Sequence, residues 1–225
     1  MAEDISGKKA ALQAFAAVAV LGAIAGALWL QTRFDDQGTA HSGPAVCSSS
    51  HEKVLRGQVS GGDLCKALNR PDLPTLLGAP GSEVESASGS ASESAIGGIK
   101  TVTPEATVDI EEYTVKLSAT YDRLGVSDFA DLVGASAQKK TVLGHPAVLY
   151  MDRTISIRFN LGGGSDKAET GAGGVAWCLL IAKDVKDGGG YYEIDIYRQD
   201  NVTPDHTTLI GLAERVLPAV PGWAA

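Results

Sequence analysis

Several acidic side chains of this 225-residue chain have a type and spacing that could support acid–base catalysis. Asp109, Glu111, Glu112 and Asp122 lie along and just beyond a predicted strand. Paired carboxylates of this kind serve acid–base catalysis in hydrolases. Alternate acids on a strand usually form its solvent-facing side, however, and nothing in the sequence brings a partner carboxylate across to them. We therefore predict no catalytic residue in this group.

Glu193 and Asp195 share one face of a later predicted strand and could meet the first group as a weak calcium site. Calcium loops need oxygen ligands at short, fixed offsets. The stretch Asp184-x-x-Asp187-Gly188 lacks the rest of that pattern. We therefore predict no metal ligand here.

Two of the four histidines, His145 and His206, fall in the predicted folded domain. Either could be a general base or a metal ligand, but isolated histidines in turns and at helix starts are usually solvated. The histidines are dispersed and no C-x-x-C pair occurs, so a zinc site is not expected. The sequence thus predicts no metal, no cofactor and no catalytic set.

The three cysteines, Cys47, Cys65 and Cys178, allow one disulfide and leave one thiol over. Cys178 lies in an apolar stretch, where a free cysteine behaves as a small core residue. We favour a bridge between Cys47 and Cys65, which would contribute about 3 kcal/mol in the chain-entropy model. A bridge between Cys65 and Cys178, or no bridge, is the alternative.

Charge and glycine patterns exclude two further classes of protein. The net charge of −8 and the scattered Lys and Arg residues argue against nucleic-acid binding, which needs a basic stripe. Glycine runs at 162–164 and 188–190 are not phosphate loops, because neither is followed by Lys-Ser or Lys-Thr.

Residues 10–30 form an almost uninterrupted apolar run. As a helix it would be about 31 Å long, which matches a hydrocarbon core of about 30 Å. Lys8 and Lys9 precede the run and only Arg33 follows closely. The positive-inside rule then predicts that residues 1–9 are a cytoplasmic tail and that the chain beyond the run is extracellular. The lipid bilayer of the plasma membrane, crossed once, is the expected partner.

A cleaved signal peptide is the alternative to this anchor. Its apolar stretch would be about 7–15 residues long and end at a small-residue site, which residues 31–36 do not offer. Cys47 follows Val46 and lies far from the run, so lipidation is not expected. Gly22 and Gly26 form a G-x-x-x-G pair and are candidates for close packing of two membrane helices.

Beyond the anchor, residues 31–53 lack periodicity and predict a flexible tether. Residues 54–225 are enough for one extracytoplasmic domain. Within it, residues 81–98 are Ser, Gly, Ala and Glu with hardly a bulky side chain. Such a composition cannot offset its ordering entropy and predicts a disordered loop.

The first half of the domain shows two kinds of period. Asp63 is expected to cap a short helix that ends before Pro71. From residue 108 the apolar residues alternate, with a change of phase at Glu111 and Glu112. That change predicts a β-bulge, or a break between two strands. Ser127 is expected to cap another short helix.

The second half is rich in strands. They are predicted at 140–143, 147–151, 154–161, 175–185 and 191–199, separated by turns at 144–146, 152–153 and 186–190 and by a loop at 162–174. A last helix begins at Pro204. Short connections imply antiparallel neighbours, so we predict an α+β fold: an antiparallel sheet packed with terminal helices.

Several sequence blocks carry a family resemblance. They are VSGGDLCKALNRPDL at 59–73, LLG at 76–78, LSATYD at 117–122, DRTISI at 152–157 and VLPAVPGW at 216–223. In these blocks the chain resembles an actinobacterial, Streptomyces-type family of uncharacterised membrane-anchored proteins with an extracytoplasmic domain of unknown function. The resemblance implies an anchored domain outside the membrane and assigns no functional residue.

The predicted function is an envelope interaction module that binds an envelope protein or a cell-wall component. The alternative is an enzyme or small-ligand carrier whose site is assembled from distant residues.

Overall fold

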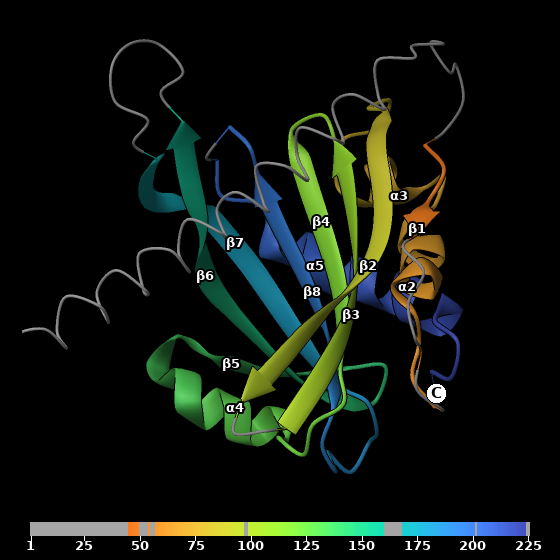
Figure 1. The fold of residues 1–225 in the computed structure, drawn as a ribbon, viewed down its shortest axis with the longest axis vertical. Coiled ribbons are helices and arrows are strands. Elements are labelled where there is room, and N and C mark those ends of the chain that lie inside the picture. The colour runs from red at the N-terminus through yellow and green to blue at the C-terminus, as the bar shows by residue number, and fades with distance from the viewer. Residues whose placement is uncertain are drawn as a thin grey trace, which may run out of the picture. The chain divides into compact units, whose positions relative to one another are not determined.

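The computed structural model describes residues 45–49, 54, 57–96, 99–159, 168–200 and 202–223. These residues form an α+β domain built on one eight-stranded sheet (Figure 1). The predicted anchor at 10–30, with Gly22 and Gly26, lies outside the described residues. Within the described part of the chain, no helix is both long enough and apolar enough to cross a bilayer.

The strands lie side by side in the order β1-β2-β3-β4-β8-β7-β6-β5. Their bounds are β1 Ser48–Ser49, β2 Val84–Ile96, β3 Ile99–Ile110, β4 Tyr113–Thr120, β5 Gln138–Val142, β6 His145–Phe159, β7 Ala168–Ala182 and β8 Tyr191–Arg198. All neighbouring strands are antiparallel except β1, which runs parallel to β2. The sheet is therefore mixed, and the predicted antiparallel pairing is right for all but its first strand.

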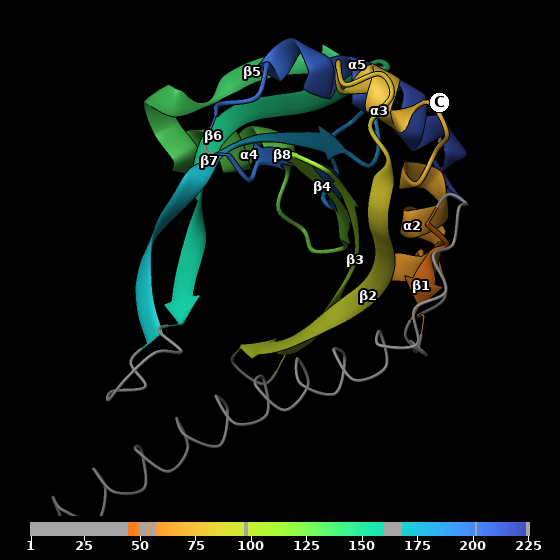
Figure 2. The same cartoon turned by 90° about the horizontal axis from the view of Figure 1, so that it is seen from above.

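Helices pack on both faces of this sheet. Their bounds are α2 Gly61–Leu68, α3 Leu73–Leu76, α4 Val126–Val133 and α5 His206–Val216, with 3-10 turns η1 Gly134–Ser136 and η2 Leu217–Ala219. Figure 2 shows that the sheet is strongly curved, with α2, α3 and α5 on its convex side and α4 inside the curve. The two faces therefore have different coverings.

The main core lies between the convex face and the three helices outside it. It is filled by alternate strand residues and by one stripe of each longer helix: Val108, Ile110, Val115, Leu117, Leu179, Ile181, Ile194 and Ile196 from the sheet, with Leu64, Leu68, Leu209, Leu212 and Val216 from the helices. Each side chain of this size contributes about 1.5–3 kcal/mol when it is fully buried. The predicted apolar face of the last helix is confirmed.

The segment predicted as a disordered loop, residues 81–98, is mostly strand β2. That prediction is wrong because it weighed only side-chain burial. The backbone of β2 is paired along its length with β3, so main-chain hydrogen bonds order a strand with few bulky residues. Only Ala87 and Gly89 of its described side-chain positions are buried.

Turns account for further differences from prediction. Glu111 and Glu112 form the turn between β3 and β4, since Ile110 is paired with Tyr113. Of the two predicted alternatives, a β-bulge or a break between two strands, the structure shows the break. Leu143 and Gly144, both at positive φ, form the next hairpin turn, as type I′ turns require.

Strand β6 is longer than predicted. It continues through the expected turn at 152–153, where the pairing with β7 shows only a register shift between Arg153 and Ile155. Strand β7 begins at Ala168, inside the expected 162–174 loop.

Helix caps also differ from the expected ones. Ser60, not Asp63, is the N-cap of α2, and the two side chains form a reciprocal capping box. Gly125, not Ser127, is the N-cap of α4. The capping acceptor there comes from the β7–β8 connection, because the Asp187 carboxylate accepts hydrogen bonds from the amides of Val126 at 2.7 Å and Ser127 at 2.8 Å.

The predicted disulfide between Cys47 and Cys65 is present, with Cα atoms 6.0 Å apart. It links α2 to the segment that contains β1, and Asn69 Nδ2 donates a hydrogen bond to the Ala45 carbonyl at 2.6 Å. Residues 45–49, expected in the tether, are therefore attached to the sheet and to α2.

Helix α2 meets β2 at two glycines. A Cβ atom on Gly61 would lie 2.1 Å from the Ser90 carbonyl oxygen, and one on Gly89 would lie 2.3 Å from the Gly61 carbonyl oxygen. Both distances are far below van der Waals contact. The absence of side chains at these positions lets the helix lie directly on the strand.

We predict that Gly61→Ala destabilises the fold by about 3 kcal/mol or more, since the new methyl group must push backbone from backbone. Gly211→Ala is the matched control, because Gly211 lies within α5 and a Cβ there meets nothing within 4 Å. That variant should be neutral or stabilised by up to about 1 kcal/mol. Urea unfolding of the full chain measures both; equal stability of the two variants would refute the close contact.

Candidate functional site

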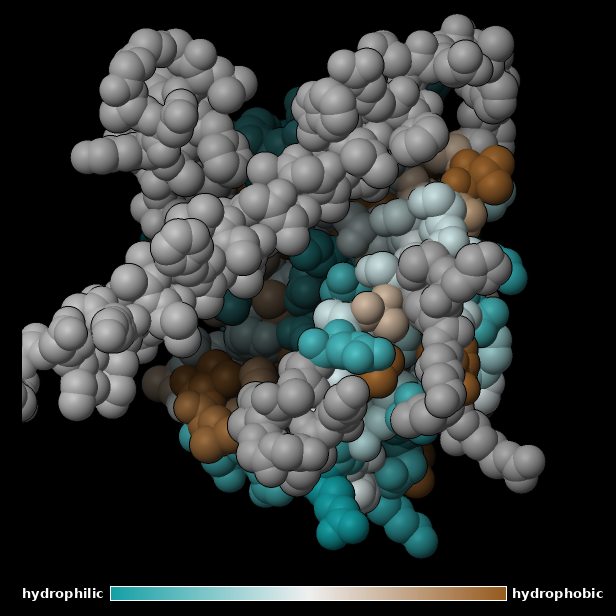
Figure 3. Space-filling view, in the orientation of Figure 1, coloured by the Kyte–Doolittle hydropathy of each residue, from teal (hydrophilic) through white to brown (hydrophobic). Residues whose placement is uncertain are grey.

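The concave face of the sheet is polar outside the part that α4 covers. Directly opposed residues of antiparallel strands share a face, and one row of such residues crosses six strands: Ser88, Thr107, Lys116, Asp195, Cys178 and Tyr150. The next row contributes Ser90, Glu105, Ser118 and Glu193. In Figure 3 the side chains at the centre of this face are hydrophilic and lie deeper than its flanks.

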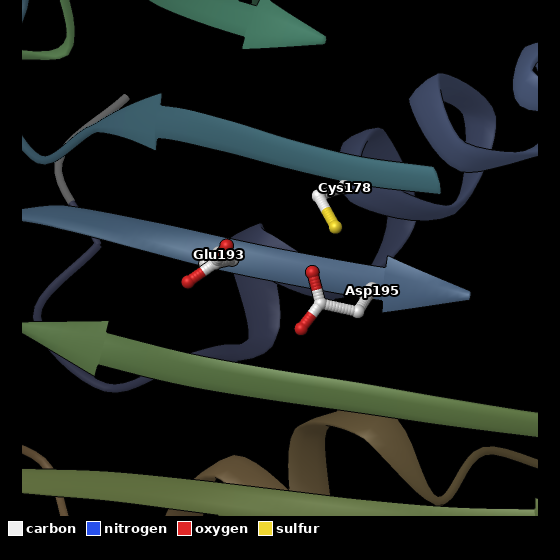
Figure 4. Close-up of side chains that lie close together, drawn as sticks. All are labelled: Cys178, Glu193 and Asp195. Carbon is white, nitrogen blue, oxygen red and sulfur yellow. The ribbon is translucent and has the colours of Figure 1, made fainter. Parts of the chain in front are cut away.

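Three side chains on this face converge in one cluster. One ligand atom each of Cys178, Glu193 and Asp195 lies within 4.8 Å of the other two. Figure 4 shows the Cys178 sulfur and the Asp195 carboxylate pointing toward one another from the neighbouring strands β7 and β8. We call these three residues the β7–β8 cluster.

Strand pairing explains the β7–β8 cluster. Cys178 and Asp195 are direct partners in the β7–β8 ladder. Glu193 is two residues before Asp195, so it projects from the same face of β8. The cluster thus follows from the register of a single hairpin.

Tyr150 holds one member of the cluster in place. Its hydroxyl donates a hydrogen bond of 2.7 Å to Glu193 Oε1. The Tyr150 ring packs against Phe129 of α4, with ring centroids 5.4 Å apart. With Val126, Ala130 and other residues, these rings form a second small core inside the curve, which shields one side of the β7–β8 cluster from water.

Asp195 is the least satisfied member of the cluster. Its Oδ1 atom is buried and has no hydrogen-bond partner among the described residues. A buried acceptor without a donor costs about 1–3 kcal/mol. Lys116, its direct partner on β4, is exposed and makes no ion pair with it within the described part of the chain.

Burial determines the protonation of this cluster. Burial and, to a smaller extent, the negative charge of Glu193 together raise the pKa of Asp195 to about 7, although the Cys178 thiol and the positive charge of Lys116 act to lower it. Burial also raises the pKa of Glu193, against the hydrogen bond from Tyr150. The pKa of the Cys178 thiol is raised by burial and by the two carboxylates. The cluster therefore holds protons at pH values where exposed carboxyls are ionised.

The acids predicted as a possible group do not come together. Asp109 accepts hydrogen bonds from Ser86 and Thr114 on the concave face. Glu111 accepts one from Ser82, and Glu112 forms an ion pair with Arg198. The weak calcium site considered from the sequence is therefore not assembled from these residues.

The two histidines lie apart from the cluster. His145, expected to be solvated, is buried: its Nδ1–H donates to the Ala182 carbonyl at 2.8 Å, and its ring lies 4.3 Å from that of Trp223. His206 is the first residue of α5 and packs on Trp177, with ring centroids 5.0 Å apart. Both contacts are structural.

Sequence reasoning missed the β7–β8 cluster because it treated Cys178 only as a core residue. The free thiol is indeed buried. The missing information was the hairpin register that pairs it with Asp195. The alternation of Glu193 and Asp195 with Ile194 and Ile196 was the signal that placed both acids on one face.

Together, the fold and the cluster define an α+β domain with a helix-covered convex face and a polar concave face. The chain belongs to a family of unknown function (DUF6215), whose model matches residues 6–136. The sequence blocks at 152–157 and 216–223 lie beyond the matched residues. No curated protein and no solved structure matches the chain.

The raised pKa of Asp195 predicts how stability depends on pH. The folded state holds a proton that an unfolded aspartic acid releases near pH 4. This stabilisation is therefore complete below about pH 4 and is lost as pH rises through about 7. We expect the free energy of unfolding to fall across that range in metal-free buffer.

Asp195→Asn should reduce this slope and raise stability at pH 8, because the amide cannot ionise. The exposed Asp128 of α4 provides the control Asp128→Asn, which should keep the wild-type slope. Urea unfolding of the full chain at pH 5, 6, 7 and 8 measures all three; an unchanged slope in Asp195→Asn would show that Asp195 ionises normally.

Proposed function

We propose that this protein is a membrane-anchored extracytoplasmic module that binds an envelope protein or cell-wall component on the concave face of its sheet. The observation that carries the proposal is the contrast between the two faces. The convex face is covered by α2, α3 and α5, whereas most of the concave face presents hydroxyl and charged groups.

The charge of the concave face favours a particular kind of ligand. Glu105 and Asp109 contribute carboxyl groups to this face outside the β7–β8 cluster, and Lys116 lies among them. Serine and threonine hydroxyls of β2, β3 and β4 alternate with these groups. Such a surface suits a polar ligand that carries positive charge, such as an amine-bearing wall or protein segment.

Two features support the proposed location. The Cys47–Cys65 disulfide suits an oxidising compartment outside the cytoplasm. The apolar run at 10–30 has the length of a membrane span, and it falls within the part of the chain that the family model matches. The actinobacterial origin and the single-pass topology with an extracellular domain belong to this proposal.

The alternative, a small-ligand carrier with a deep apolar pocket, finds less support. Such sites are lined mostly by apolar side chains. Here the apolar part of the concave side is the small core that α4 already fills. The open part is polar.

We predict that a photo-crosslinking amino acid at Ser88 or Lys116 captures a partner in intact cells that carry the full chain. Both positions are exposed on the concave face. Lys66 is the matched control, because it is exposed on α2, which covers the convex face. Adducts that form equally at Lys66, or none at the concave positions, would contradict the proposed binding face.

The topology predicts the outcome of protease treatment. Protease added to cells stripped of their wall should cut between residues 31 and 44 and release the disulfide-linked domain. Protection of the whole chain would refute an extracellular domain. Release without protease would instead indicate a cleaved signal peptide.

A further inference from the structure

We propose that Cys178, Glu193 and Asp195 form a binding site for a divalent cation of the zinc type. This inference stands apart from the proposed partner, since the cluster lies within one domain and can be tested with the metal alone. The sequence suggested Glu193 and Asp195 only as part of a weak calcium site with other acids, and it did not bring Cys178 to them.

The ligand atoms of the β7–β8 cluster are spaced closely enough to share one ion. A sulfur and two carboxylate oxygens lie within 4.8 Å of one another. Zinc holds thiolate sulfur at about 2.3 Å and carboxylate oxygen at about 2.0–2.2 Å. Ligand atoms around one tetrahedral ion are therefore roughly 3.5 Å apart, a distance that small side-chain rotations would reach here.

One carboxylate oxygen of Asp195 is buried without a hydrogen-bond donor among the described residues. This atom is Oδ1, which is inaccessible to solvent. The carboxylate is aimed at the Cys178 sulfur (Figure 4). A dication between the two groups would supply the missing partner and compensate the charges that burial disfavours.

A supporting hydrogen bond is already present. Metal-ligating carboxylates are commonly oriented by a second group, and the Tyr150 hydroxyl donates to Glu193 Oε1 at 2.7 Å. The Tyr150 ring is in turn packed on Phe129. The Glu193 carboxylate is therefore positioned before any ion binds.

The donor set determines the class of metal. A thiolate with two carboxylates suits zinc and similar borderline cations, whereas calcium and magnesium take oxygen ligands only. Three protein ligands leave the fourth zinc position open. A water molecule or an external group would coordinate at that position.

The test uses the full chain in mild detergent, without reductant, and Zn²⁺ or Co²⁺ alone. We expect one Zn²⁺ per chain by calorimetry and a thiolate-to-cobalt absorption band with Co²⁺. Cys178→Ser should abolish the band, and Asp195→Asn should weaken Zn²⁺ binding at least about tenfold. Asp109→Asn, which removes another carboxylate of the same face, should leave the cobalt absorption band and the Zn²⁺ affinity unchanged. Ca²⁺ and Mg²⁺ should not bind.

Three outcomes would overturn the site: no Zn²⁺ binding, no thiolate band with the wild-type chain, or binding that survives both substitutions. The wild-type band decides the question even if a variant fails to fold. Because no cellular partner takes part, failure here would leave the cross-linking result at Ser88 and Lys116 unaffected.

Discussion

Burial of two carboxyl groups beside a thiol, without a paired cation, is the constraint on which the concave face depends. Glu193 and Asp195 lie on β8, an inner strand with β4 on one side and β7 on the other. Charged carboxylates that lose water without a counter-charge raise their pKa rather than remain ionised. Either a proton or a cation must therefore reside in the β7–β8 cluster.

The surrounding fold creates this burial. The convex face is closed by three helices, and the backbone contact between Gly61 and Gly89 lets α2 lie directly on β2. Inside the curve, α4 covers only one part of the sheet, where Phe129 packs on Tyr150. Asp187 accepts hydrogen bonds from the first amides of α4, so the β7–β8 connection that sets the cluster's register also supports the helix beside it.

The structure was best predicted from the sequence where the pattern of apolar side chains or the cysteines indicated which residues are buried or bonded. The alternation of β4, the apolar stripe of α5 and the Cys47–Cys65 bridge were all predicted, because each leaves a periodic or pairwise trace in the sequence. The prediction failed at β2, since main-chain pairing with β3 orders a strand of small polar residues without any apolar signal. The β7–β8 cluster was missed for a related reason. The turn predicted at 186–190 is centred at residue 188, and a hairpin with that centre would not pair Cys178 with Asp195. The observed connection between β7 and β8 runs from Lys183 to Gly190. It includes Asp187, Gly189 and Gly190 at positive φ.

The most direct test of this account is the carboxyl ¹³C titration of Glu193 and Asp195 by NMR in the metal-free protein. The account predicts that at least one of the two carboxyls is still protonated at pH 6, because burial and mutual repulsion disfavour two charges. Midpoints below pH 5 for both carboxyls would show that water or another counter-charge already compensates them, and would contradict the account.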